Sequence, residues 1–183
     1  NDNPSAIILK NNNLHIEIII NRLAFSAKSD PAGIADIIVE AAVTTICDHE
    51  DSVASVDASD KVKGYRNWLG LMKGELKSNF VKKGKNFVRK LNPDRSFITK
   101  DGSKSKLKGR ALLLNRNTGH LMTNPSILLE DGSEIPEGIM DAFITSLCSM
   151  HDLELKKNSL KGSIMIVKPK QHGPDECLSL IHI

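Results

Sequence analysis

The sequence predicts an α/β fold, because short runs of apolar and β-branched residues alternate with stretches that have helical spacing. Three runs are typical of buried strands: Val43 to Cys47, Ala111 to Leu114, and Ser163 to Val167. A helical pattern lies between successive runs, so the order is strand, helix, strand, helix, strand. This order indicates a parallel sheet, since parallel strands need a long crossover between them.

The first 40 residues predict one strand and one helix. Residues Leu14 to Ile20 alternate and then become continuously apolar, which indicates a strand. Asp30 and Pro31 are typical of a helix start. We therefore expect a helix from Asp30 with apolar residues at helical spacing: Ile34, Ile37, Ile38 and Ala41.

A second helix is expected after the first buried strand. Residues Asp48 to Ser52 form a polar loop, and Asp57 has the side chain of an N-cap, with Asp60 three positions later. The helix should end near Gly74, and Trp68 should lie in the core or in an interface. Its apolar face carries Val62, Tyr65, Leu69 and Met72.

The region between the second and third helices breaks the helical pattern. Phe87 to Leu91, Ser96 to Thr99, and the turn at Asp101-Gly102 predict a small hairpin region. Asp131-Gly132 predicts another turn, and Pro136 lies near the first position of the third helix. The core side of that helix should carry Ile139, Met140, Phe143, Ile144, Leu147 and Met150.

Composition limits the class of protein. The chain has 183 residues, 40% hydrophobic and 4% aromatic, which allows a domain-sized and mostly aliphatic core. It contains no run of about 18 apolar residues, so no transmembrane helix and no membrane partner are expected. Three scattered cysteines lack metal-site spacing and suit a reducing compartment, which predicts a cytoplasmic protein.

Positive charge is concentrated in one segment. Residues 73–110 hold 13 of the 25 Lys and Arg residues but only three of the 22 acidic residues. Such an excess can mark a polyanion site or can be a solvated charged face. A nucleic-acid partner is not expected, because no aromatic interleaving or known binding motif accompanies the charge.

Arg116 follows the apolar run that ends at Leu114 and precedes a turn that contains Gly119. A strand end of this kind is where α/β proteins place ligand chemistry. A guanidinium offers several donors in a fixed fork, so Arg116 suits a carboxylate or a developing oxyanion. The alternative is a surface ion pair.

Three acids crowd the loop after the first buried strand, at Asp48, Glu50 and Asp51. Like charges this close repel one another unless a cation or a basic group lies near. The alternative is a solvated acidic loop without a ligand.

Several blocks of the sequence are similar to a single family. They include Asn115-Arg116-Asn117-Thr118-Gly119-His120-Leu121-Met122, Tyr65-Arg66-Asn67-Trp68-Leu69-Gly70-Leu71-Met72-Lys73-Gly74, and Ile166-Val167-Lys168-Pro169-Lys170 with His172-Gly173-Pro174. They occur in family order from about residue 14 to about residue 176. The chain resembles malate synthase, specifically the large bacterial G-type enzyme.

The resemblance implies a partial TIM (β/α)8 barrel with part of an inserted α/β domain. Residues 1–40 would end the first part of the inserted domain and 41–73 would belong to the barrel. Residues 74–110 would be the basic second part of the insertion, and 111–176 would return to the barrel. Because G-type enzymes are several times longer, we expect an internal fragment. Residues 177–183 depart from the family, which predicts a non-native tail.

The resemblance also implies an activity: condensation of acetyl-CoA with glyoxylate and water to give malate and CoA, in the glyoxylate cycle. Arg116 would be the catalytic and glyoxylate-binding arginine, and Ser52 and Arg89 would contact acetyl-CoA. Asp48 and Glu50 would lie in the outer shell of a Mg²⁺ site. The metal ligands would lie beyond this chain, so the fragment alone is expected to be inactive.

Some positions are not explained by the resemblance. The family usually has cysteine where this chain has His49, and no role is assigned to Lys168, Lys170 or His172. The full-length protein is expected to be a monomer. The alternative to an enzyme is a non-catalytic CoA-binding module or a pseudoenzyme.

Overall fold

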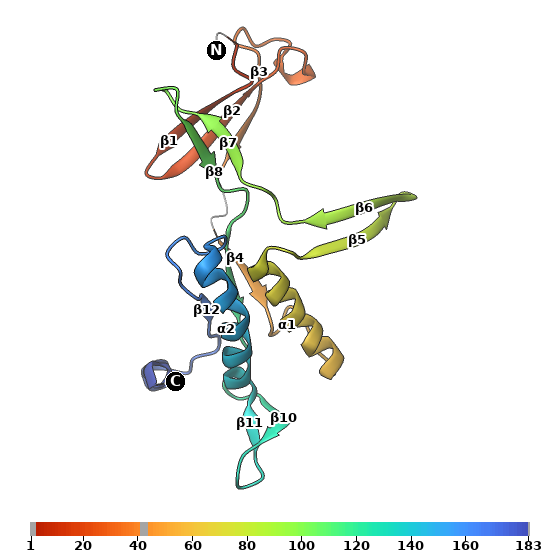
Figure 1. Cartoon of the computed structure of the whole chain (residues 1–183), viewed down its shortest axis with the longest axis vertical. Helices are drawn as coiled ribbons and strands as arrows, with labels where there is room; N and C mark the ends of the chain where they lie inside the picture. The colour runs from red at the N-terminus through yellow and green to blue at the C-terminus, as the bar shows by residue number, and fades with distance from the viewer. Residues whose placement is uncertain (1–2, 41–43, 183) are drawn as a thin grey trace. The chain divides into compact units, whose positions relative to one another are not determined.

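The computed structural model describes residues 3–40 and 44–182. Contacts divide the chain into two compact units, residues Asn1–Val43 and Thr44–Ile183. Both helices and strands are present, so the mixed α/β class predicted from the sequence is confirmed (Figure 1). The division of the chain into barrel and inserted-domain segments stays a prediction.

The first unit is an antiparallel sheet of three strands in the order β1-β2-β3. Strand β1 (Ala6–Asn11) pairs with β2 (Leu14–Ile20), and β2 pairs with β3 (Ile34–Val39). A short 3-10 helix, η1 (Phe25–Ala27), lies in the connection between β2 and β3. The strand predicted at residues 14–20 is therefore confirmed.

The helix expected from Asp30 is wrong, because this segment forms a turn followed by β3. The Asp30 carboxylate accepts a hydrogen bond from the Ala32 amide at 2.7 Å, and Gly33 has a φ of 75°. That left-handed backbone ends any helical course. The β-branched residues that follow then pair with β2, where branched side chains are favoured. Ala41, the last residue of the expected helix face, lies outside the described residues.

The second unit is built on a parallel sheet with the strand order β12-β9-β4. Strand β4 (Thr44–Asp48) pairs with β9 (Leu112–Arg116) along its whole length, and β12 (Ile166–Val167) pairs with the other side of β9. The parallel arrangement predicted from the sequence is confirmed, although β12 is shorter than expected. Val43, the predicted start of the first strand, lies outside the described residues.

Two helices lie side by side over this sheet: α1 (Ala58–Lys73) and α2 (Glu137–Leu155) (Figure 1). As predicted, the Asp57 side chain caps α1 by accepting from the Asp60 amide at 2.9 Å. Gly74 ends the helix with a φ of 73°, a left-handed conformation that glycine adopts without strain. The buried core between helices and sheet contains Trp68, Met72, Leu113 and Cys148.

The predicted core side of α2 is partly wrong. Met140 is buried, but Phe143 and Leu147 are 72% and 65% exposed, and Met150 is exposed too. The helix instead turns a largely polar face inward, at Asp141, Thr145, Cys148, Ser149 and Asp152. These polar groups have partners: the Trp68 indole Nε1 donates to the Thr145 carbonyl at 3.1 Å and to Ser149 Oγ at 2.9 Å. Apolar spacing alone could not indicate which neighbours the helix would meet.

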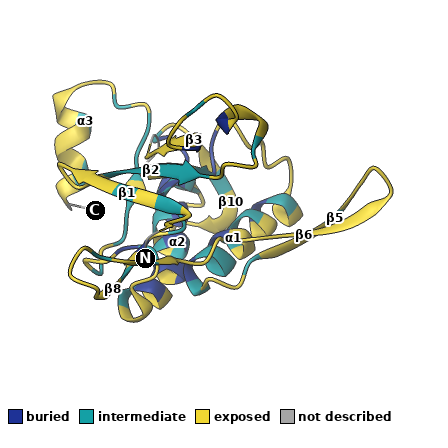
Figure 2. Ribbon diagram, turned by 90° about the horizontal axis from the view of Figure 1, so that it is seen from above, coloured by how far each residue is buried: buried dark blue, intermediate teal, exposed yellow. Residues whose placement is uncertain are grey.

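Three hairpins complete the second unit. The basic segment forms β5 (Lys77–Lys82) with β6 (Lys85–Lys90), and β7 (Arg95–Ile98) with β8 (Lys104–Leu107). Both hairpins are largely exposed (Figure 2). The third pairs β10 (Thr123–Leu128) with β11 (Glu134–Pro136), and the predicted turns at Asp101-Gly102 and Asp131-Gly132 are confirmed.

The described chain ends in α3 (Pro174–Ser179) and the 3-10 helix η2 (Leu180–His182). Among residues 3–40 and 44–182, no helix is long and apolar enough to cross a membrane. The sheets that the described residues form are small, and none of them closes on itself.

Replacing Trp68 by Phe should lower the free energy of unfolding by about 1–3 kcal/mol. The loss arises because the buried acceptors on α2 would lose their indole donor. Urea unfolding followed by circular dichroism measures it. Phe143→Leu, on the exposed face of α2, is the matched control and should change stability little. Equal effects of the two variants would contradict this account of the core.

Candidate functional site

Two oppositely charged residues lie opposite each other where β4 and β9 end. The parallel register pairs Asp48 with Arg116. The Arg116 side chain donates from Nε to Asp48 Oδ1 at 2.7 Å and from Nη2 to Asp48 Oδ2 at 2.6 Å. This is a side-on, bidentate pair, which fixes both the position and the plane of the guanidinium.

Asp48 is held in its ionised form by further donors. Its carboxylate accepts from the Glu50 amide at 3.0 Å, from the Ser52 amide at 2.9 Å and from the Ser52 hydroxyl. The Arg116 guanidinium and these donors hold the pKa of Asp48 well below its usual range. The same pair raises the pKa of Arg116, so Arg116 remains a cation and cannot accept a proton at ordinary pH.

Glu50 is the second buried acid of the loop. Lys170, which follows β12, places its Nζ 2.9 Å from Glu50 Oε1 and 3.0 Å from Asp51 Oδ2. Arg116 Nη1 lies 3.9 Å from Glu50 Oε2. The predicted repulsion among the three acids is therefore relieved by two cations from other strands. Asp48 and Glu50 do not form a merely solvated loop, because both carboxylates are nearly buried.

The pairing leaves one edge of Arg116 available. Nε and Nη2 are engaged by Asp48, whereas the described contacts give Nη1 no hydrogen bond. An oriented guanidinium with a free pair of N–H donors can bind a carboxylate or stabilise an oxyanion. The orientation comes from Asp48, and the free edge faces Glu50.

A buried charge network, which we did not predict, lies between the helices and the strand ends. Lys61 Nζ is 2.7 Å from Glu137 Oε1 and 2.8 Å from Asp141 Oδ1, and the Tyr65 hydroxyl donates to Asp141 at 2.6 Å. The Thr118 amide also donates to Asp141, at 2.8 Å. Burial alone would raise the pKa of Asp141, but these donors outweigh it and the pKa is lowered. In the sequence, Lys61 is one charged residue among many in a helix.

His49 points away from the acids that flank it. Its ring is buried, stacks on Tyr65 at 5.3 Å between centroids, and has Nδ1 within 3.1 Å of the Asn115 side chain. A Cβ added at Gly64 would lie 3.1 Å from the ring. Burial lowers the pKa of His49, and Lys61 lowers it further, while Asp141 and the Asn115 hydrogen bond oppose the shift. His49 thus packs the loop after β4 against β9 and α1.

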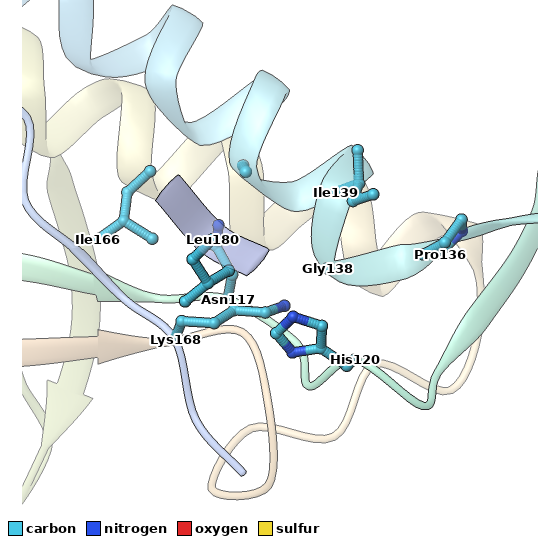
Figure 3. A pocket seen from close by; sticks show the side chains of 9 residues that line it. Asn117, His120, Pro136, Gly138, Ile139, Ile166, Lys168 and Leu180 are labelled. Atoms are coloured by element: carbon cyan, nitrogen blue, oxygen red, sulfur yellow. The ribbon is translucent and has the colours of Figure 1, made fainter. Parts of the chain in front are cut away.

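Lys168, Lys170 and His172, which had no predicted role, have different partners in the structure. Lys170 joins the acids near Arg116, whereas Lys168 Nζ donates to the Thr118 carbonyl beside the N-terminus of α2. His172 contacts Glu176 instead. Lys168 lines a cavity of about 340 Å³, shown in Figure 3, together with Asn117, His120, Pro136, Gly138, Ile139, Ala142, Ile166 and Leu180. Asp48, Glu50 and Arg116 are not among its lining residues.

Ser52 and Arg89, the two predicted acetyl-CoA contacts, lie in different parts of the second unit. Ser52 lies against Asp48, so it joins the Arg116 cluster. Arg89 lies on β6 with its guanidinium 5.1 Å from the centre of the Phe80 ring, and no described hydrogen bond or ion pair links it to Arg116. Phe80 stacks on Phe87 at 5.6 Å. The expectation that the basic segment lacks interleaved aromatic residues is therefore wrong for this hairpin.

The charged cluster does not by itself form a complete metal site. Within the part of the chain that the structure describes, no group of three or more His, Cys, Asp or Glu side chains could hold a metal ion. Glu50 Oε1 is paired with Lys170 Nζ at 2.9 Å, whereas Oε2 accepts no hydrogen bond from the described residues and lies 3.9 Å from Arg116 Nη1. Oε2 can therefore accept from a water molecule bound to an ion, as an outer-shell carboxylate does.

These features define a class: a parallel α/β protein with a charged cluster at the carboxyl ends of its strands. The family described as malate synthase, TIM barrel domain, matches residues 112–181. The match includes Arg116 and all of α2. Residues 112–181 are therefore similar to the TIM barrel domain of malate synthases.

Proteins named malate synthase G match nearly the whole chain. Identity is 56% over 178 residues with that of Corynebacterium efficiens, 54% over 176 residues with that of Corynebacterium glutamicum, and 53% over 176 residues with that of Halalkalibacterium halodurans. The matches cover 94–96% of this chain but 24% of each relative, so the chain spans about a quarter of their length. The resemblance to the G-type enzyme is confirmed.

Replacing His49 by Cys should flatten the dependence of stability on pH between about 7 and 5. Folding lowers the pKa of His49 from its ordinary value near 6.5. Below that pH, the unfolded chain therefore binds more protons at His49 than the folded chain does. Stability contributed by neutral His49 is thus complete above about pH 6.5 and is lost as pH falls, by at most about 1.4 kcal/mol per pH unit.

Urea unfolding at a series of pH values measures this slope. His151→Gln is the control, because His151 is exposed on α2 and should leave the slope unchanged. An unchanged slope in His49→Cys would contradict the assignment of a buried, neutral imidazole.

Proposed function

We propose that this chain is a segment of a malate synthase that condenses acetyl-CoA with glyoxylate and water to give malate and CoA. The relatives are named malate synthase G. The observation that carries the proposal is Arg116, held side-on by Asp48 with Nη1 free. Such a group suits an acidic aldehyde substrate and the oxyanion formed from a thioester.

The chemistry explains why a fixed arginine is needed. The methyl group of a thioester is a weak acid, so its enolate forms only where negative charge is strongly stabilised. Donors that are already oriented stabilise that charge without reorganising during the reaction. In this proposal the Nη1 edge of Arg116 binds glyoxylate and stabilises the enolate oxygen. Asp48 keeps the guanidinium in place and keeps it charged.

A divalent ion, Mg²⁺ in this proposal, would polarise the glyoxylate aldehyde when bound. The first-shell ligands would come from chain beyond these residues. Glu50 and Asp48 would act from the outer shell, Glu50 through its Oε2 atom and Asp48 through Arg116. The segment alone would therefore be inactive.

Acetyl-CoA would contact Ser52 and Arg89. The Ser52 hydroxyl lies beside Asp48, so a thioester near Ser52 would also be near Arg116. Arg89 would bind a phosphate of CoA, a role that suits its charge and its place in the basic hairpin. The described conformation does not join these two contacts, so a CoA molecule would have to span them.

A partial barrel accounts for the exposed apolar strand residues. Ile46 on β4 and Ile166 on β12 are 52% and 38% exposed, although they lie in the two outer strands of the parallel sheet. In a complete barrel, further strands would pair with these edges and cover these side chains. The intact protein would be a cytoplasmic monomer of the glyoxylate cycle, without nucleic-acid or membrane partners.

In the full-length protein, Arg116→Lys should lower kcat by about 100- to 1,000-fold, because one ammonium cannot reproduce an oriented guanidinium edge. The assay is thiol release from acetyl-CoA with and without glyoxylate and Mg²⁺. Arg110→Lys, outside the cluster and before β9, is the matched control. Thiol release that needs both additions and collapses only in Arg116→Lys would support the proposal.

If the folded wild-type protein releases no thiol but still binds CoA, the proposed malate synthase activity is wrong. The non-catalytic CoA-binding module or pseudoenzyme would then be favoured. Binding to nucleic acid that weakens steeply with salt, without affinity for CoA, would favour a basic nucleic-acid module instead.

Arg89→Met should weaken CoA binding by about 10- to 100-fold, the effect of losing a charge-assisted phosphate contact. Isothermal titration with CoA and with 3′-dephospho-CoA identifies the phosphate involved. Arg95→Met, in the neighbouring basic hairpin, controls for the loss of one positive charge. Unchanged CoA affinity in Arg89→Met would remove Arg89 from the site.

A further inference from the structure

One lysine links the two outer strands of the parallel sheet. Lys170 follows β12, and Glu50 and Asp51 follow β4, with β9 between these strands. Lys170 Nζ lies 2.9 Å from Glu50 Oε1 and 3.0 Å from Asp51 Oδ2. The side chain therefore passes over the end of β9, just beyond Arg116.

Gly119 provides the space for this link. A Cβ added at Gly119 would lie 3.2 Å from Glu50 Oε1 and 3.4 Å from Lys170 Cδ. The first distance is tighter than ordinary contact and the second is at its lower limit, so the ion pair rests against the glycine backbone. A larger residue here would press on the carboxylate and the lysine together.

The buried Glu50 carboxylate needs the charge of Lys170 for its stabilisation, whereas the solvated Asp51 carboxylate does not. The Glu50 side chain is 4% exposed and its other oxygen is 3.9 Å from Arg116, whereas the Asp51 side chain is 67% exposed. A buried carboxylate without a close cation is costly, but a solvated one is not. Without Lys170, Glu50 would turn toward solvent and leave the free edge of Arg116.

We propose that Lys170 is a positioning residue: it holds the Glu50 carboxylate toward the free edge of Arg116, and Gly119 is the space that lets it do so. The inference rests on the proposed function, in which Glu50 acts near the reacting groups. Lys170 itself needs no contact with substrate. Its effect on the reaction passes through Glu50.

The main test is a double-mutant cycle in the full-length protein, with kcat and the KM for acetyl-CoA measured for Lys170→Met, Glu50→Gln and the double variant. Lys170→Met should lower kcat by about 10- to 100-fold, the usual effect of losing an outer-shell partner, with little change in KM. In the Glu50→Gln background, Lys170→Met should lower kcat no further. Losses that multiply would overturn the proposal, because the two residues would then act independently.

Two further variants separate positioning from general damage. Lys170→Arg should keep most of the wild-type kcat that Lys170→Met loses, because a guanidinium can still bridge to Glu50. Lys161→Met, exposed in the loop before β12, is the matched control and should leave kcat unchanged. Failure of Lys170→Arg to restore activity, with the same unfolding midpoint as wild type, would count against the bridge.

Gly119→Ala tests the space beneath the ion pair. It should reduce kcat in the wild-type background and have little effect after Glu50→Gln and Lys170→Met have removed the pair. A loss of the same size in both backgrounds would show that Gly119 acts through something other than this pair.

Carbodiimide coupling tests the bridge without catalysis. The reagent activates the Glu50 carboxylate, the Lys170 amine displaces the activated group to form an amide, and the carbodiimide leaves as a urea that carries the elements of water. Peptide mapping by mass spectrometry locates the link. Glu50→Gln should remove this link and leave only coupling to Asp51. Absence of any amide from Lys170 to either Glu50 or Asp51 in the wild type would overturn the geometry. Formation of this amide in a full-length protein that showed no malate synthase activity before treatment would instead overturn the proposed function, and positioning with it.

Discussion

The register of β4 on β9 is the constraint on which the site depends. Because Asp48 pairs with Arg116, both side chains leave their strands on the same face and at the same level. A slip of one residue would turn Asp48 to the opposite face and bring His49 or Cys47 beside Arg116. The side-on ion pair, the hydrogen bonds from Ser52 and the approach of Glu50 to Nη1 all follow from this pairing.

Alternation along β9 gives the two faces of the sheet different roles. Leu113 packs in the core with Trp68, and Asn115 holds the His49 ring, so these side chains face the helices. Arg116 lies between Asn115 and Asn117 and points the other way, toward the acids. One strand therefore anchors the helices and presents the cation, because successive side chains of a strand point to opposite faces.

Buried charges on both faces are compensated at short range. Lys61 neutralises Asp141 beneath the strand ends, while Arg116 neutralises Asp48 above them. An unpaired charge in either place would be strongly destabilising, so each pair constrains the segments that supply it. This explains why α2 turns a polar face inward: Asp141 must reach both Lys61 on α1 and the Thr118 amide after β9.

The sequence by itself determined the local features: the alternation of the three parallel strands with α1 and α2, the bounds of α1 between Asp57 and Gly74, and the placement of Arg116 at a strand end. These depend on side chains and backbone preferences within a few residues of one another. Only the tertiary structure decided that Ile34–Val39 is a strand, that Asp141 is buried, and that Lys170 rather than Lys168 meets Glu50. Each of these outcomes depends on partners distant in the sequence, and local periodicity carries no information about which distant groups will meet.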